Sequence, residues 1–354
     1  MLLRILFYTI GILLRLMPLV VFYIDLYRNP WHNRLKKAGY TEKETVVGKV
    51  RFHYAESGNS DQTPLLLLHA GMLDWFSYHR VMVKLCTDYH VYAVDYPGQG
   101  KTRYPDDYEM NAVNIGTSLA QFIEEVIVEP VSVCGNGEGG LLAVRLAAER
   151  PDLIRAAVLE DPPLFTSEYP AIRNTAAYRS FRICDRAVSE DREGDYLRFR
   201  LRNSSDLAGI DIGRMKKGIL TILIIVSRML HWQKTTEIPF VSEYMREIIR
   251  GLDQYSPYFG KAFYDGEWNE NFDHTEALCR IQCPVLLMQA DTLFLSDGTL
   301  KGAMSEENAQ FACSGLRNVK YIKMHSKHVI HLDQPEEYLM HVTEFLSQSN
   351  KDNI

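Results

Sequence analysis

Apolar positions along the chain follow two alternating patterns. Short unbroken apolar runs, typical of strands buried on both faces, occur at Leu65–Leu68, Val91–Asp95, Val131–Cys134, Ala156–Leu159, Val285–Met288 and Val319–Met324. Segments with helical spacing of apolar residues separate these runs, at 77–85, 113–126, 141–150 and 335–347. Because strands that alternate with helices form parallel sheets with right-handed crossovers, the pattern predicts a doubly wound α/β fold.

Two stretches depart from this rhythm. Residues 46–54 alternate and turn as two short antiparallel strands do, which places the start of the core near residue 45. Residues 164–280 have a mostly helical pattern, with an apolar run at 218–229 and many aromatic residues. We therefore expect a core formed by residues 45–163 and 281–354, with residues 164–280 inserted as a helical cap.

Residues 1–27 differ in character from the rest of the chain. From Ile5 to Ile24 every residue is apolar or nearly so, except Arg15. About 20 residues of helix suffice to cross the ~30 Å hydrocarbon layer of a bilayer. No small-residue cleavage site follows, so the segment does not resemble a removable signal peptide. These features predict a membrane-attached N-terminal helix.

The mode of this attachment has two alternatives. A charge at Arg15 and a kink at Pro18 oppose a spanning helix. A helix lying in the membrane interface fits better with one stripe of Arg4, Tyr8, Gly11 and Arg15. Residues 28–44 have the composition of a basic linker, containing Arg28, Arg34, Lys36 and Lys37. Basic residues beside an apolar segment favour the cytoplasm, so we expect the main domain on the cytoplasmic side.

Composition and charge exclude several function classes. The chain of 354 residues has a net charge of −6 and no basic stripe, which argues against a nucleic-acid partner. Cys279 and Cys283 are spaced too widely for a CxxC site and no second pair completes a zinc site, so we expect all six cysteines to be reduced thiols in core and helix positions. The sequence predicts no bound metal and no cofactor.

The most informative turn connects the apolar run 131–134 to the following helix. It reads Gly135–Asn–Gly–Glu–Gly139, which places Gly137 at the centre of a G-x-S-x-G-like pattern. In such a turn the central residue is strained and exposed above a helix N-terminus. A phosphate-binding loop is disfavoured, because neither the dinucleotide-binding pattern nor the P-loop with its lysine is present.

Five motifs in chain order resemble those of the α/β-hydrolase superfamily over about residues 45–347. They are His69–Ala–Gly71, Asp95–Tyr–Pro–Gly–Gln–Gly–Lys–Thr102, the turn at 135–139, the strand at Pro284–Ala290, and Ser326–Lys–His328–Val–Ile–His331 followed by Pro335–Glu–Glu. The resemblance implies a mostly parallel eight-stranded sheet with a cap insertion. It places the nucleophile of a serine hydrolase at Gly137.

The resemblance also implies the remaining catalytic residues. His328 is the expected general base, and His331 is the alternative. His69 is expected to support the loop that carries Gly71, called the oxyanion loop below. The acid that orients the base is expected at Asp161, as in haloalkane-dehalogenase-like members, with Asp297 and Asp291 as alternatives after the later strand. Glu160 should point to the other side of its strand.

Backbone N–H groups of Gly71 or Met72 and of Glu138 are the expected oxyanion donors. Backbone donation tolerates any side chain, so Glu138 is compatible with this role when its carboxylate points to solvent. Gly137, however, offers no side chain, so no acyl-enzyme can form there.

Three interpretations of this missing nucleophile remain open. The chain can be a hydrolase relative that lost one residue, an enzyme in which His328 activates water, or a binding protein without catalysis. The composition of the cap favours an apolar or amphipathic small molecule, such as an ester or lipid reached from the membrane surface.

Overall fold

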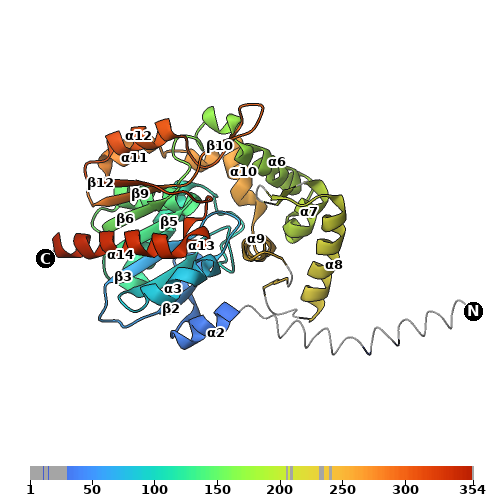
Figure 1. The fold of residues 1–354 in the computed structure, drawn as a ribbon, viewed down its shortest axis with the longest axis horizontal. Helices are drawn as coiled ribbons and strands as arrows, with labels where there is room; N and C mark the ends of the chain where they lie inside the picture. The colour runs from blue at the N-terminus through green and yellow to red at the C-terminus, as the bar shows by residue number, and fades with distance from the viewer. Residues whose placement is uncertain are drawn as a thin grey trace, which may run out of the picture.

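The computed structural model of the chain describes residues 11, 15, 30–204, 206–207, 210–230, 235–238 and 241–352. Its main feature is an eight-stranded sheet in the order β1-β2-β4-β3-β5-β6-β9-β12 (Figure 1). The strands are β1 (Thr41–Val47), β2 (Val50–Ser57), β3 (Pro64–Leu68), β4 (His90–Asp95), β5 (Val131–Asn136), β6 (Ile154–Glu160), β9 (Val285–Gln289) and β12 (Val319–Lys323). Strand β2 pairs antiparallel with both of its neighbours, β1 and β4, and the remaining neighbours in the sheet pair in parallel. The predicted mostly parallel sheet is confirmed.

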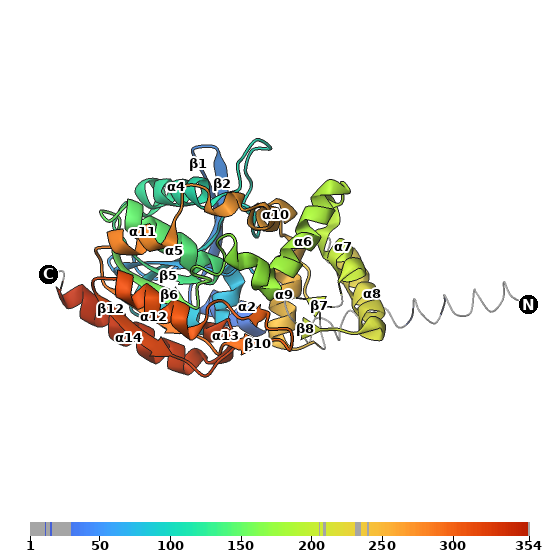
Figure 2. The same ribbon diagram turned by 90° about the horizontal axis from the view of Figure 1, so that it is seen from above.

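Helices cover both faces of this sheet. They are α2 (Pro30–Lys37), α3 (His79–Leu85), α4 (Ala112–Phe122), α5 (Glu138–Glu149), α11 (His274–Arg280), α12 (Glu306–Gly315), α13 (Ile330–Asp333) and α14 (Pro335–Asp352). Figure 2 shows α4, α5 and α11 on one side of the sheet and α14 on the other. Leu66 and Leu68 pack into one core and Leu65 and Leu67 into the second. Both faces of β3 are therefore buried, which explains its unbroken apolar run.

Residues between β6 and α11 form the cap beside this sheet (Figures 1 and 2). Its helices are α6 (Ala176–Ser189), α7 (Tyr196–Asn203), α8 (Arg214–Leu230), α9 (Glu243–Asp253) and α10 (Pro257–Asp265). Phe259, Phe263 and Trp268 are fully buried: Phe263 stacks on Trp268, and Phe259 meets both rings at a tilt, so these aromatic residues pack the cap. Two small antiparallel sheets are also present. One pairs β7 (Asp206–Leu207) with β8 (Ile210–Asp211), and the other pairs β10 (Leu293–Phe294) with β11 (Leu300–Lys301).

Single helical turns complete the connections. They are η1 (Trp75–Tyr78), η2 (Ile123–Ile127), η3 (Ala171–Asn174), η4 (Glu193–Asp195) and η5 (Glu267–Asn269). η1 is important for the site, because it directly precedes α3 and follows the loop that carries Gly71. Asp74 caps it by accepting a hydrogen bond from the Phe76 N–H.

The structure differs from the expected basic linker at residues 28–44. Helix α2 and the first half of β1 occupy most of this segment. Leu35 is buried against α3, and the Tyr40 hydroxyl donates to the Met82 carbonyl at 2.9 Å. The basic residues of α2 mask a short apolar face, which is why the sequence pattern suggested a linker.

Other expectations concern the N-terminus and the cysteines. Apart from residues 11 and 15, the segment 1–27 lies outside the residues described, as does the choice between a spanning and an interfacial helix. Within the described ranges, no helix has the length and apolar character needed to cross a bilayer. All six cysteines are free; Cys134 and Cys184 are buried, whereas Cys279 is exposed rather than part of the core.

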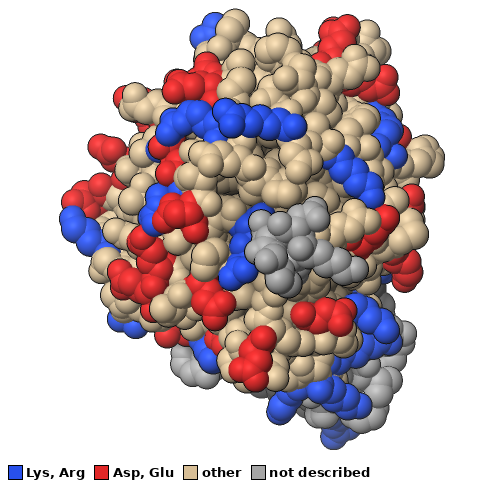
Figure 3. Space-filling model, turned by 90° about the vertical axis from the view of Figure 1, so that its left-hand side faces the viewer, with Lys and Arg blue, Asp and Glu red and all other residues tan. Residues whose placement is uncertain are grey.

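Surface charges are mixed on the face seen in Figure 3. Lysine and arginine side chains lie among aspartates and glutamates there. Among the described surface residues, Lys320 pairs with Glu344 and Arg280 with Glu149, so oppositely charged side chains often meet. Exposed pairs of this kind contribute only about 0–1 kcal/mol each to stability.

Candidate active site

The turn between β5 and α5 has the geometry of a strained elbow. Gly137 lies at φ 55° and ψ −120°, a backbone conformation that L side chains rarely adopt. Its N–H donates to the Glu160 carbonyl at 2.9 Å, which ties the turn to β6. At Gly139 a Cβ atom would lie 2.2 Å from the Leu68 carbonyl oxygen. This close packing brings the N-terminus of α5 against the end of β3.

His328 lies directly above this elbow. A Cβ atom at position 137 would stand 2.9 Å from His328 Nε2 and 3.3 Å from Cε1. A side chain at 137 would therefore face the imidazole, as a nucleophile faces its base, but the ring would have to move by a few tenths of an ångström to make room for it. The glycine leaves His328 without that partner.

Asp161 is the carboxylate that the structure brings to His328. Its Oδ2 lies 2.8 Å from His328 Nδ1, and its side chain is almost fully buried. The residue follows β6 with φ 44°, and its N–H donates to the Met288 carbonyl at 2.7 Å. Its Oδ1 accepts from the Ala290 N–H at 3.2 Å. These bonds hold the carboxylate in the orientation that a histidine base needs.

The two alternative acids are placed elsewhere. Asp297 is exposed and forms an ion pair with Arg179 at 2.6 Å. Asp291 pairs with His325 at 2.7 Å. Neither contacts His328, so the structure favours Asp161 as the acid.

His331 and Glu160 form a separate buried pair. Glu160 Oε2 lies 2.8 Å from His331 Nδ1, and its Oε1 accepts from the His331 N–H at 2.9 Å. The His331 ring stacks on Tyr78 with the centroids 3.9 Å apart. Both side chains are fully buried. Glu160 thus points away from Asp161, and His331 supports the loop that carries His328.

Asn136, which the sequence analysis did not single out, fixes this loop to the elbow. Its Nδ2 donates to the carbonyls of His328 at 3.0 Å and Glu160 at 3.1 Å. The signal available in the sequence was a polar residue at the end of an apolar strand, directly before the elbow centre. Such a residue must find partners when it is buried.

The charge environment of His328 favours its protonated form. Desolvation, the largest single effect, lowers the pKa of His328, but the hydrogen bond and charge of Asp161 together with the charges of Glu138 and Glu160 outweigh it. The net pKa of His328 lies above the ordinary value for histidine. About a third of the side chain, 35%, remains accessible, so a ligand can reach the ring.

The oxyanion donors differ from the expectation. The Gly71 N–H donates to the Glu138 side chain, with Oε2 at 2.8 Å, so the carboxylate does not point to solvent. The Met72 N–H donates to Gln99 Oε1 at 3.2 Å. Because Gly71 has no side chain, the Glu138 carboxyl group can fold against it; a Cβ there would lie 3.0 Å from Glu138 Cδ. A negative group therefore occupies the place where an oxyanion would be stabilised.

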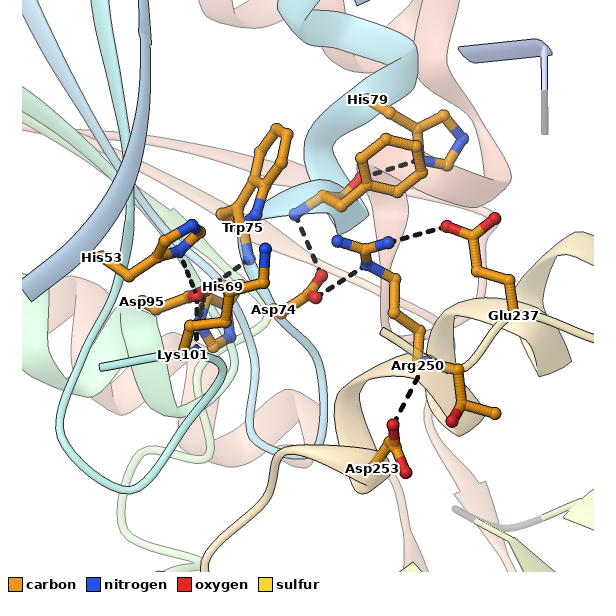
Figure 4. A network of polar contacts seen from close by, with 12 residues as sticks. His53, His69, Asp74, Trp75, His79, Asp95, Lys101, Glu237, Arg250 and Asp253 are labelled. Atoms are coloured by element: carbon orange, nitrogen blue, oxygen red, sulfur yellow. Dashed lines mark hydrogen bonds and ion pairs between the residues drawn. The ribbon is translucent and has the colours of Figure 1, made fainter. Parts of the chain in front are cut away.

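A buried polar network holds the loop that carries Gly71 (Figure 4). Asp95 accepts from the Trp75 N–H at 2.8 Å and lies 2.8 Å from His53 Nδ1. His69 stacks on Tyr96 and lies near Asp95, with its Nδ1 2.8 Å from the Ala70 carbonyl, as expected for a supporting residue.

On the cap side of this loop, Arg250 of α9 donates to Asp74 at 2.7 Å and to Glu237 at 2.7 Å. Arg250 lies 176 residues beyond Asp74 in the chain. No local sequence pattern indicates this contact, because it joins the cap to the oxyanion loop only in the folded protein.

Among the described residues, no group of three or more His, Cys, Asp or Glu side chains is arranged to hold a metal ion. The chemistry that this site offers is therefore that of His328 with Asp161, beside a glycine and the Glu138 carboxylate.

Comparison with known proteins agrees with the fold and the motif order. The sequence model of the Alpha/beta hydrolase family matches residues 65–340. The chain is 29% identical over 154 residues to the chloroplastic pheophytinase of Arabidopsis thaliana, covering 34% of this chain and 32% of that protein. It is 33% identical over 110 residues to a haloalkane dehalogenase of Psychrobacter cryohalolentis, covering 29% of this chain and 35% of that protein. The chain thus spans about a third of the length of these curated relatives.

Solved structures match over most of the chain. A membrane phospholipase A, described as a bacterial virulence factor, superposes with a TM-score of 0.61 at 18% identity, covering 98% of this chain and 99% of that one. A carboxylesterase from Bacillus subtilis gives a TM-score of 0.60 at 17% identity, covering 90% and 96%. At these identities the likeness concerns the fold.

Proposed function

Because the chain belongs to the alpha/beta hydrolase family, we propose that it is a membrane-associated protein with a hydrolase-type site for an apolar, ester-like small molecule. One observation carries the proposal: His328 and Asp161 are in hydrogen-bonding contact directly above the elbow, where Gly137 leaves the nucleophile position empty. The site keeps the base and lacks the group that forms a covalent intermediate.

The chemistry proposed is acid–base catalysis without an acyl-enzyme. His328, when neutral, accepts a proton from a water molecule that attacks the carbonyl carbon of the bound ester, and Asp161 stabilises the imidazolium that results. The C–O bond of the ester then breaks, and the imidazolium returns its proton to the leaving alcohol. Loss of the nucleophile in a related triad leaves a residual acceleration of about 10³ over water, so the expected turnover is slow.

Ligand binding without turnover is the second candidate, and Glu138 favours it. Its carboxylate accepts the Gly71 N–H that would otherwise stabilise an oxyanion. Removing one such donor costs about 10²–10³ in rate. With both the nucleophile and this donor lost, binding is the function left to the site.

Hydrolysis of short and medium p-nitrophenyl esters separates the two candidates. We expect slow hydrolysis by the unmodified protein that His328→Ala reduces to background. The rate should rise with pH through the pKa of His328, because only the neutral imidazole accepts a proton. That pKa is raised by Asp161 and nearby carboxylates, so the midpoint should lie above ~6.5.

Asp161→Asn serves as the companion variant. Without the carboxylate, the pKa of His328 falls, and the midpoint of the pH profile should move down by at least about one unit. Equal rates for the unmodified protein and His328→Ala at every pH, with an ester analogue still bound, would assign the site to binding.

Membrane association is the second part of the proposal. It rests on the apolar segment 5–24 and on the basic residues that follow, which also favour a cytoplasmic main domain. A membrane phospholipase A shares the fold over nearly the whole chain. The partner we propose is an apolar or amphipathic molecule reached from the bilayer surface, and not a nucleic acid.

Deleting residues 1–29 tests this part. The described fold begins with α2, so the shortened chain should fold and shift from the membrane fraction to the supernatant. Flotation with lipid vesicles and circular dichroism measure the two properties. A folded, shortened chain that floats as completely as the full chain would show that residues 1–29 are not the main anchor.

A further inference from the structure

Helix α8 of the cap is apolar on two opposite faces. Leu220 and Ile224 are buried against the cap. Four described apolar side chains of the same helix are exposed, with the fractions Ile219 54%, Ile222 63%, Ile225 38% and Met229 76%. At about 100° per residue, these four lie within an arc of roughly 120° opposite the buried pair. We call these four side chains the outer row of α8.

Charged residues lie outside this row. Of the side chains described between residues 217 and 229, the charged ones are Lys217 and Arg228, and both fall outside the arc. Arg228 is turned toward the cap, where it pairs with Asp195 at 3.0 Å and with Asp253. Single exposed apolar residues are common, but a continuous uncharged row of four marks a surface that meets another apolar phase.

The location of α8 suggests what that phase is. The helix forms the outer edge of the cap, remote from the sheet, in both views of the fold (Figures 1 and 2). Its Ser227 hydroxyl donates to the Glu237 carbonyl at 3.0 Å, and Glu237 Oε1 lies 2.6 Å from His32 Nε2 of α2. Helix α2, which follows the apolar segment 1–27 in the sequence, is therefore connected to the C-terminal half of α8.

We propose that the outer row of α8 inserts into the surface of a lipid bilayer, as a second membrane contact beside the N-terminal segment. This inference rests on the membrane association proposed above and adds a specific surface to it. An amphipathic helix that lies in the interface buries such a row of side chains to the level of the upper acyl chains.

Two features favour a bilayer over a protein partner. The outer row is entirely aliphatic or thioether, without the aromatic and arginine anchors that dominate protein interfaces. Arg34, Lys36 and Lys37 of α2, joined to α8 through the His32–Glu237 contact, are exposed. Basic residues at this position attract anionic headgroups.

Photo-crosslinking with full-length protein tests the inference. The chain is bound to phosphatidylcholine–phosphatidylglycerol vesicles that contain a phospholipid with a photoreactive group in its acyl chain, and labelled peptides are identified by mass spectrometry. We expect label on residues 214–230 as well as on residues 1–27. In Ile222→Gln/Met229→Gln, label on 214–230 should fall at least about fivefold, because interfacial insertion scales with apolar area. Label on 1–27 should stay unchanged.

The matched control is Val46→Gln/Met340→Gln. These residues are 54% and 56% exposed, and they lie on β1 and α14, outside the cap. The control should label 214–230 as fully as the unmodified chain.

Each contrary result has a distinct meaning. Label on 1–27 with none on 214–230 would overturn the role of α8 and leave the membrane association standing. A protein that stays in the supernatant without any label would overturn the membrane association itself. Protein–protein cross-links between the α8 helices of two copies, in place of lipid label, would assign the outer row to self-association and overturn the inference.

Discussion

Gly137→Ser combined with Glu138→Ala is expected to turn this protein into an esterase, with activity at least about 10³-fold above that of the unmodified chain. The serine side chain would face His328; because Nε2 lies only 2.9 Å from the place of its Cβ, the imidazole must move back by a few tenths of an ångström to accept the serine. Removing the Glu138 carboxylate frees the Gly71 N–H to donate to an oxyanion. The double variant would therefore have both the nucleophile and the oxyanion donor that acyl transfer needs, in a site whose base is already oriented by Asp161.

The single variants separate the two contributions. Gly137→Ser alone should be about 10²-fold less active than the double variant, because the carboxylate still occupies the oxyanion donor. Glu138→Ala alone should raise only the slow water-mediated hydrolysis, because it frees the Gly71 N–H but restores no nucleophile, and it should stay well below the double variant. Glu149→Ala, at the other end of α5, is the matched control for losing a glutamate from this helix and should not raise the activity of Gly137→Ser.

Stability and dependence on the base complete the test. A side chain at φ 55° should lower the free energy of unfolding by about 1–3 kcal/mol, measured by urea denaturation. Adding His328→Ala to the double variant should return hydrolysis to background. A folded double variant that is inert towards esters, lactones and thioesters would argue against a hydrolase-type site and favour the binding role.

Arg250→Met is expected to give the largest loss of stability, about 3–5 kcal/mol in the free energy of unfolding. The Arg250 side chain is 3% exposed and bridges Asp74 of the oxyanion loop and Glu237 (Figure 4). Its guanidinium group also lies 4.5 Å from the centre of the Phe76 ring. Burial already raises the pKa of Asp74, and the charge of Arg250 opposes this rise. Without Arg250, a buried carboxylate is left with no compensating cation, which destabilises the fold.

Arg179→Met is the matched control. Arg179 forms an ion pair with Asp297 in which both side chains are more than half exposed, at 56% and 53%. Its loss should cost only about 0–1 kcal/mol. Urea unfolding of both variants measures the difference. Equal losses in the two would show that Arg250 does not carry the connection between the cap and the oxyanion loop.

Much of the fold was determined by local sequence pattern. The apolar run 65–68 forms a strand buried on both faces, because each leucine meets one of the two cores. Ser305 begins α12 with a capping box, and Pro335 begins α14, as the helix signals at these residues indicate. Such signals act within a few residues, so they can be recognised from the sequence alone. The linker at 28–44 was misjudged because α2 has a single buried leucine, Leu35, and its other signals are basic.

Sequence motifs determined which turns form the candidate site, but not which side chains contact one another there. The order of the turns brought Gly137, His328 and Gly71 to one edge of the sheet, because the carboxyl ends of parallel strands meet there. The acid was expected at Asp161, with Asp297 and Asp291 as alternatives, since carboxylates follow both strands at this edge. The 2.8 Å contact of Asp161 with His328 exists only once β6 and the loop after β12 are packed together.

Side-chain direction is what only the tertiary structure decided. The residue type at 138 was plain in the sequence, but its carboxylate can point to solvent or to the Gly71 N–H, and packing of the elbow against the end of β3 selects the second. Arg250 and Asp74 are likewise unremarkable in sequence and meet across 176 residues. Partners this far apart are set by the docking of the cap on the core, a property of the whole fold that no local pattern encodes.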